Sequence, residues 1–204
     1  MSVVCPITLD REKLKSEVRS IYAKVAENPQ GEFHFHRGPE YAAHLLGYDA
    51  AELGELPAAA TASFAGVGNP FLMDSLPVGA TVVDIGSGAG MDCLLAAPRV
   101  GRTGSVVGID MTDAMLARAR ASAAEAGFAQ ARFEKADMTA LPLPAESVDV
   151  VISNGVINLA PDKEAVFSEL YRVVRPGGRL QFADIVIETE LSERARNNID
   201  LWTG

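Results

Sequence analysis

The chain has 204 residues, which suits one compact domain, and its 48% apolar and 22% charged residues are those of a soluble globular protein. Its 18 basic and 27 acidic residues give a net charge of −9, which argues against nucleic-acid or anionic-membrane partners. The two cysteines, Cys5 and Cys93, are too few for a disulfide framework, so we expect a cytoplasmic protein. We expect no signal peptide and no membrane span, because Pro and Gly interrupt the longest uncharged stretch, residues 56–73.

Residues 1–75 predict a set of short helices with few large apolar side chains. A charged amphipathic helix is expected at 10–27, a turn at 28–31, and further helices at 39–46 and 57–65. Tyr22 of the first helix either closes over a ligand or packs the helix down. Such a segment makes a poor independent core. We therefore expect residues 1–75 to form a helical lid and substrate region on a core of residues 76–204, within one structural domain.

From residue 81 onward, short β-branched runs alternate with helical patterns, which is typical of a parallel α/β sheet. Strands are predicted at 81–85, 105–109, 131–134, 148–153 and 179–187. Three helices are expected between the strands. The first covers 91–97 and is stopped by Pro98, the second runs from Thr112 to a cap at Gly127, and the third runs from Pro161 to the Pro-Gly-Gly at 176–178. The predicted fold is α/β, a Rossmann-like doubly wound and mainly parallel sheet, whose ligands bind at the carboxyl ends of the strands.

A glycine turn joins the first predicted strand to the helix that follows. Its glycines are Gly86, Gly88 and Gly90, whereas the dinucleotide-binding pattern GxGxxG would need glycine at position 91, which is methionine. Asp84 ends the strand two residues before the turn. A carboxylate there would repel a pyrophosphate, so the turn favours a cationic or amine-bearing ligand.

The next two strands end in further carboxylates. Asp110 follows Gly90 by about 20 residues, the spacing at which a carboxylate can bind both hydroxyls of a ribose. Met111 can lie on a purine face, Asp137 can accept a hydrogen bond from an adenine amine, and Met138 can add apolar packing. Together these residues predict a pocket for an adenosine that carries an amino-acid tail and no phosphate.

The ordered motifs DIGSGAG (84–90), GIDMT (108–112), ADM (136–138), DVVISN (149–154) and RPGGRL (175–180) resemble the class I S-adenosylmethionine-dependent methyltransferases. The resemblance implies S-adenosyl-L-methionine as cofactor and S-adenosyl-L-homocysteine as product. It assigns Asp110 to the ribose and Asp137 to the adenine. The methionine moiety would be held by Asp84 and by the backbone of Gly86, Ser87, Gly88 and Gly90, and the cofactor and substrate would be faced by Ser153 and Asn154.

Three stretches, 65–70, 107–113 and 152–163, resemble the arsenite methyltransferases more narrowly. Enzymes of that family bind trivalent arsenic through cysteine thiolates, and two of the positions correspond to Val67 and Gly155 here. Neither residue supplies the soft sulfur ligand that arsenic needs. The family continues through further strands after the helical segment expected at 192–204, and we expect those strands to be missing from this sequence.

His34 and His36 alternate with phenylalanines in the predicted lid. We expect these histidines and Asn154 to position the substrate, with a purely structural role for the histidines left open. No ligand set for a metal is complete, so no metal is expected. Three functions remain: a methyltransferase for a small-molecule acceptor, an arsenite methyltransferase that uses Cys5, Cys93 or an external thiol such as glutathione, and a cofactor-binding protein without turnover. The sequence predicts no particular oligomeric state.

Overall fold

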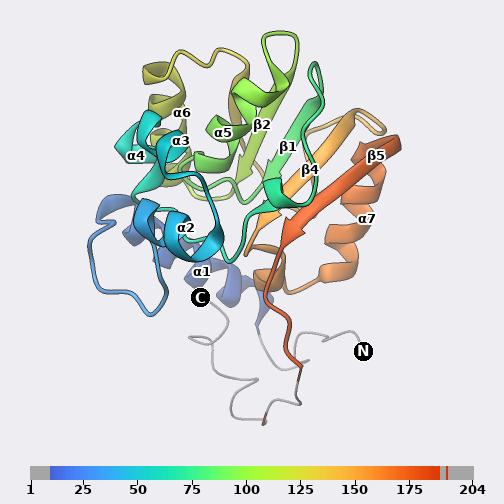
Figure 1. Ribbon diagram of the computed structural model, residues 1–204. Helices are drawn as coiled ribbons and strands as arrows, with labels where there is room; N and C mark the ends of the chain where they lie inside the picture. The colour runs from blue at the N-terminus through green and yellow to red at the C-terminus, as the bar shows by residue number, and fades with distance from the viewer. Residues whose placement is uncertain (1–9, 189–191, 193–204) are drawn as a thin grey trace.

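The structure is a computed structural model that describes residues 10–188 and residue 192. Five parallel strands form one sheet in the order β3-β2-β1-β4-β5 (Figure 1). The strands are β1 (Thr81–Ile85), β2 (Ser105–Asp110), β3 (Ala131–Lys135), β4 (Val148–Asn154) and β5 (Val174–Ala183). The predicted α/β doubly wound fold is confirmed.

Helices cover both faces of the sheet (Figure 1). Helices α5 (Met91–Val100) and α6 (Asp113–Glu125) pack on the face that carries Val82 and Val106. Helix α7 (Lys163–Val173) packs on the opposite face, which carries Val83 and Val107. Neighbouring residues of a strand point to opposite faces, and both faces are buried at the centre of the sheet, so β1 and β2 are mostly apolar along their length.

The segment before β1 contains α1 (Arg11–Glu27), α2 (Gly38–Leu46), α3 (Ala50–Glu55), α4 (Ala58–Thr61) and the short 3-10 helix η1 (Pro70–Leu72). Asp10 caps α1, as its side chain accepts hydrogen bonds from two backbone amides of the first turn. Leu14 and Val18 of α1 pack on Leu159 of the 3-10 helix η2 (Ile157–Leu159), which follows β4. Figure 1 shows α1 and α2 at the end of the sheet toward which the strand arrows point. That this segment acts as a lid stays a prediction.

Several element boundaries differ from the sequence prediction. Helix α5 continues through Pro98 to Val100, because proline in the last turn removes only one backbone hydrogen bond. Strand β5 pairs Val174 with Val148 and then Arg179 with Val150. Residues 175–178 between these pairs therefore form a bulge within the strand, whereas the sequence predicted that they end the preceding helix. Strand β5 also ends at Ala183, before the predicted limit of 187. Helix α4 is shorter than predicted, and α3 was not predicted.

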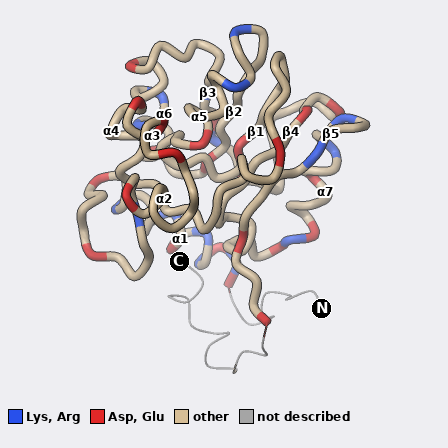
Figure 2. Tube along the Cα trace, viewed as in Figure 1, with Lys and Arg blue, Asp and Glu red and all other residues tan. Residues whose placement is uncertain are grey.

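Charged residues of both signs are interspersed. Figure 2 shows Lys and Arg positions scattered among acidic ones over several elements, and ion pairs such as Arg99–Glu52 and Lys135–Asp113 join them. Within the described ranges, no helix has the length and apolar character needed to cross a bilayer. Cys5 and most of the helical segment predicted at 192–204 lie outside the described residues.

Candidate functional site

A cleft with about 1160 Å³ of empty space, part of it open to solvent, lies between α1 and the carboxyl ends of the strands. Of the predicted cofactor residues, it is lined by Asp84, Gly86, Ser87, Gly88, Asp110, Met111, Asp137, Met138 and Asn154. Gly90 and Ser153 are not among the described lining residues. Gly90 is the N-cap of α5, and the Ser153 hydroxyl donates a hydrogen bond to the Ile85 carbonyl at 3.2 Å, which ties β4 to β1. The carboxylates converge because the strands are parallel and end at one edge of the sheet.

The glycine turn is fastened to the end of β2. The amides of Gly86 and Ser87 donate to the Ile109 carbonyl at 2.8 and 3.0 Å, and the Gly88 amide donates to Asp110 Oδ2 at 2.9 Å. Gly86 has a φ of +71°, and a Cβ placed on it would lie 2.4 Å from Val156. This position therefore requires glycine both for its backbone conformation and for the close approach of Val156 in the loop after β4.

Asp110 lines the cleft and is held by backbone amides. Its Oδ1 accepts from the Thr112 amide at 2.8 Å and its Oδ2 from Gly88. Burial raises the pKa of Asp110, and these hydrogen bonds partly offset the rise. Burial and the nearby Asp110 charge also raise the pKa of Tyr22, a residue of α1, to about 12, so its phenol is neutral at physiological pH.

Two neighbouring buried carboxyls, Asp84 and Asp92, also line the cleft. Burial, followed by the charge of Asp92, raises the pKa of Asp84 well above its usual range. Burial raises the pKa of Asp92 to about 6, although Tyr48 and Asn154 donate hydrogen bonds to it. A cationic group bound beside this pair would stabilise both carboxylates in their ionised form.

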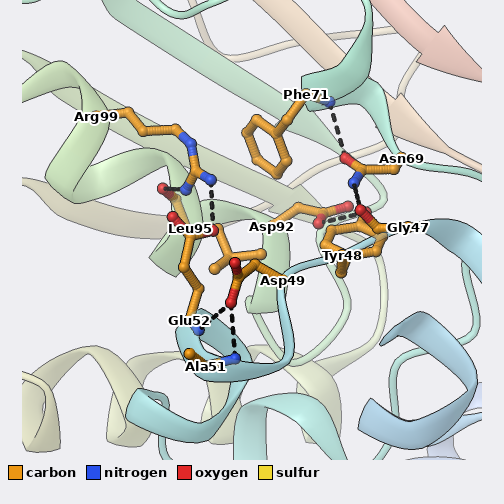
Figure 3. A network of polar contacts seen from close by, with 10 residues as sticks. All are labelled: Gly47, Tyr48, Asp49, Ala51, Glu52, Asn69, Phe71, Asp92, Leu95 and Arg99. Carbon is orange, nitrogen blue, oxygen red and sulfur yellow. Dashed lines mark hydrogen bonds and ion pairs between the residues drawn. The ribbon is translucent and has the colours of Figure 1, made fainter. Parts of the chain in front are cut away.

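Asn154 fixes the loop that contains Val67 and Gly68. Its Oδ1 accepts from the Val67 amide at 2.8 Å and the Gly68 amide at 3.1 Å, and its Nδ2 donates to the Tyr48 hydroxyl at 2.9 Å. The Tyr48 hydroxyl in turn donates to Asp92 Oδ1 at 2.8 Å, and Figure 3 shows these two side chains side by side. The sequence analysis missed Tyr48 and Asp92. Asp92 could have been identified from the sequence as a site residue, because it lies in the first turn of the helix that directly follows the glycines.

Asp137 binds a lysine from the N-terminal segment. Its Oδ2 accepts from Lys15 Nζ at 2.7 Å, and its Oδ1 accepts from the Thr139 amide and hydroxyl at 2.9 and 2.6 Å. Burial alone would raise the pKa of Asp137, but the hydrogen bonds from Lys15 and Thr139 outweigh it, and the pKa is lowered. Lys15 was also missed by the sequence analysis. It connects α1 to the end of β3 across the cleft.

Two buried hydroxyls of the cleft, Ser63 Oγ and Ser87 Oγ, have no hydrogen-bond partner in the described part of the chain. Buried polar atoms are nearly always paired, so these two hydroxyls are exceptions in the wall of the cleft. The acidic pair, the Asp110 carboxylate and the apolar Met111 together fit a ligand with a cationic end, a diol and a flat ring.

A second pocket, with about 530 Å³ of empty space that is partly open to solvent, adjoins the cleft. Five residues line both: Tyr22, Ala65, Gly66, Gly155 and Leu159. His36 and Val67 line the second pocket, and a Cβ placed on Gly155 would lie 3.1 Å from Val67 Cγ1. His34 lines neither pocket among the described residues, since it packs edge-on against Phe35 with ring centroids 5.2 Å apart.

The thiol of Cys93 is wholly buried and donates a hydrogen bond to Asp84 Oδ2 at 3.2 Å. Burial and the Asp84 charge raise its pKa, so the thiol stays protonated and is a poor metalloid ligand. In residues 10–188, no three His, Cys, Asp or Glu side chains form a group that could hold a metal ion.

A family model described as "Methyltransferase domain" matches residues 77–203, so the chain belongs to the methyltransferase domain family. The predicted resemblance to class I methyltransferases that use S-adenosyl-L-methionine is confirmed. Within that class, the chain is 43% identical over 159 residues to an arsenite methyltransferase from Halobacterium salinarum, a match that spans 78% of this chain and 40% of that protein.

Two further relatives are methyltransferases by name. The crystal structure of an arsenic(III) S-adenosylmethionine methyltransferase from Chlamydomonas reinhardtii matches with a TM-score of 0.66 and 37% identity, over 71% of this chain and 51% of that chain. A nocamycin O-methyltransferase from Saccharothrix syringae is 37% identical over 61% of this chain and 44% of its own length. The chain thus spans about half or less of the length of these relatives.

Proposed function

We propose that this chain binds S-adenosyl-L-methionine in the main cleft and transfers its methyl group to a small-molecule acceptor without using protein thiolates. The observation that carries the proposal is the Asp110 carboxylate, which lines the cleft beside the glycine turn and is positioned there by two backbone amides. We also propose a cytoplasmic location, from the cysteine usage and the composition.

S-adenosyl-L-methionine would supply an electrophilic methyl group on a sulfonium. Asp84 and Asp92 would face its cationic end, Asp110 its ribose, and Asp137 its adenine amine. Transfer of a methyl group needs in-line positioning more than acid–base chemistry. Helix α1, through Tyr22, would cover the cleft and exclude water during the reaction.

The residues around the second pocket argue against a thiolate site. Val67 and Gly155 occupy the positions at which the resemblance to arsenite methyltransferases implies cysteines. Gly155 has a φ of +70°, and a Cβ there would already crowd Val67. Cys93 is buried and donates a hydrogen bond to Asp84, and Cys5 lies outside the described residues.

A second candidate is arsenite methylation with thiols supplied from outside, and the 43% identity to an arsenite methyltransferase favours it. A third is cofactor binding without turnover. The O-methyltransferase relative supports an organic acceptor instead.

Calorimetric titration with S-adenosylhomocysteine tests the binding claim. Asp110→Ala should weaken the affinity by about 100-fold or more, because it removes two hydrogen bonds to a charged group, each worth about 1.5–3 kcal/mol. Asp113→Ala is the matched control, since its side chain is 78% exposed, and it should bind as the parent does. Equal affinity of the two variants would refute the proposed site.

Product formation separates the three functions. S-adenosylhomocysteine released with uncharged organic acceptors, and not with arsenite plus glutathione, supports the first. Release with arsenite plus glutathione supports the second, and binding with no release over a broad panel supports the third.

A further inference from the structure

Tyr48 lies behind the acidic pair of the cleft and contacts one member of that pair. The residue follows α2, is buried, and is not among the described residues that line the cleft. Its ring packs edge-on against Phe64 and Phe71, with centroids 5.4 and 6.3 Å apart. Its hydroxyl donates to Asp92 Oδ1 at 2.8 Å (Figure 3). Any effect of Tyr48 on a ligand in the cleft must therefore pass through its neighbours.

Asn154 fixes the direction of this hydrogen bond. The backbone amides of Val67 and Gly68 both donate to Asn154 Oδ1, so the amide nitrogen of the side chain must face the other way. That nitrogen donates to the Tyr48 hydroxyl oxygen at 2.9 Å, which leaves the hydroxyl proton for Asp92. Burial and the charge of Asp92 raise the pKa of Tyr48 well above its ordinary range, so the hydroxyl keeps this proton.

The two carboxyls of the pair have unequal partners. Asp92 accepts from the Tyr48 hydroxyl and, at 3.2 Å, from the Asn154 amide. It also lies in the first turn of α5, where the helix dipole favours a negative charge. Asp84 accepts from the thiol of Cys93 at 3.2 Å, and a thiol is a weak donor. Because hydrogen bonds to a carboxylate favour its charged form, Asp92 is the member of the pair that ionises first.

The charges around the pair increase this difference. Burial, and then the charges of Asp92 and Asp110, raise the pKa of Asp84 well above its usual range. Burial raises the pKa of Asp92 only to about 6, because its hydrogen bonds and the charge of Arg99 oppose the rise. At pH 7 the pair therefore holds one proton, which lies on Asp84. In the described part of the chain, the groups that act on the pair are Tyr48, Cys93, Arg99, Asp110 and Asn154.

We propose that Tyr48 is a positioning residue of the cofactor site, which keeps Asp92 ionised and leaves the single proton of the pair on Asp84, and that the ammonium group of the ligand expels this proton. The inference rests on the proposed function and adds a proton to its binding equilibrium. As the ligand binds, the O–H bond of the Asp84 carboxyl breaks, its electron pair stays on the carboxylate, and the proton passes to the buffer. The effect is electrostatic, so the ammonium group must lie near the pair but need not touch its oxygens.

Three nucleosides provide the test. S-adenosylhomocysteine and its decarboxylated analogue 5′-(3-aminopropylthio)-5′-deoxyadenosine carry an ammonium group, and 5′-methylthioadenosine carries none. Each is titrated calorimetrically in two buffers of different ionisation enthalpy, which gives the number of protons released on binding. The two ammonium compounds should release about one proton at pH 7, and their affinity should rise from pH 6 to pH 8. 5′-Methylthioadenosine should release no proton and should bind equally at both pH values.

Tyr48→Phe keeps the ring and removes only the hydroxyl, so Asp92 loses its shortest hydrogen bond and holds a proton to higher pH. The affinity for S-adenosylhomocysteine should fall about 3- to 30-fold at pH 6.5 and less than about twofold at pH 8.5, where Asp92 is ionised again. The affinity for 5′-methylthioadenosine should not change, which also shows that the variant is folded. The matched control is Tyr171→Phe on α7, at a residue that is 86% exposed, and it should bind all three compounds as the parent does.

Two results would overturn the inference: binding of S-adenosylhomocysteine without proton release, or an equal loss of affinity for all three compounds at every pH in Tyr48→Phe. The second result is the one expected if Tyr48 only packs the loop after α2.

If S-adenosylhomocysteine does not bind at all, the proposed function fails, and carbon-13 NMR of the aspartate carboxyl groups still decides how the pair is protonated. With signals assigned from Asp84→Asn and Asp92→Asn, Asp92 should titrate at lower pH than Asp84. In Tyr48→Phe the titration of Asp92 should move to higher pH. The reverse order in the parent, or an unchanged titration in the variant, would refute the role of Tyr48.

Discussion

Replacement of Asn154 by alanine should destabilise the protein and weaken its binding of S-adenosylhomocysteine. The Asn154 side chain, at the end of β4, accepts hydrogen bonds from the Val67 and Gly68 amides in the loop before η1. It also donates a hydrogen bond to the hydroxyl of Tyr48, in the loop after α2. In Asn154→Ala both amides lose their acceptor, while Tyr48 keeps its hydrogen bond to Asp92. Both amides are half-buried, so each one left without its acceptor should lower the free energy of unfolding by about 1 kcal/mol or somewhat more. We expect a total loss of about 2–4 kcal/mol in the free energy of unfolding.

Urea denaturation at pH 7 measures this loss, with Asn69→Ala as the comparison. Asn69 serves the same loop, but it caps only the Phe71 amide and donates to the Gly47 carbonyl (Figure 3). Its loss should be about 1 kcal/mol. If Asn154→Ala costs no more than Asn69→Ala, the assigned role of Asn154 is wrong.

The remaining predictions concern charge and backbone conformation. The Asn154 amide nitrogen lies 3.2 Å from Asp92, so Asn154→Asp places a second carboxylate beside that residue. Burial raises the pKa of Asp92 to about 6, so both groups are charged at pH 8 and repel each other. Relative to the parent, the variant should therefore be less stable at pH 8 than at pH 5, as measured by urea denaturation at both pH values. Lys15→Met should cost at most about 1 kcal/mol at pH 7, since the ion pair with Asp137 is partly exposed. The pKa of Asp137 is lowered in the fold, so the ionised carboxylate stabilises the protein above its usual pKa of 3.8, and this contribution is lost as the pH falls. Lys15→Met should therefore lose less stability than the parent on acidification. An equal loss would contradict the pairing of Lys15 with Asp137. Gly155→Ala should destabilise more than Gly127→Ala, because both have φ near +70° but only Gly155 has a neighbour within 4 Å, and thermal melting of the two variants measures the difference.

The sequence predicted those parts of the fold that depend on local pattern. The strands β1 and β2 are short β-branched runs between turn residues, and their limits were predicted to within one residue. The start of β5 was missed because Pro-Gly-Gly at 176–178 is typical of a helix end, whereas here it forms a bulge with a φ of +79° at Gly177. Helix α3 was missed because it is short and buries only Leu53.

The candidate site divides in the same way. Asp84, Asp110 and Asp137 were predictable, since each follows or ends a parallel strand and such ends meet at one edge of the sheet. Lys15 and Tyr48 were not, because they reach the site from helices whose packing on the sheet depends on contacts far apart in the sequence. Asn154 was predicted to contact a ligand, yet its contacts in the structure are with the loop at 67–68 and with Tyr48, and its contact with substrate remains a prediction.

The most direct test of the account is a crystal structure of the protein with S-adenosylhomocysteine bound. We expect both ribose hydroxyls within hydrogen-bond distance of the Asp110 carboxylate, and the amino group beside Asp84 and Asp92. A nucleoside bound elsewhere, or a ribose that points away from Asp110, would contradict it.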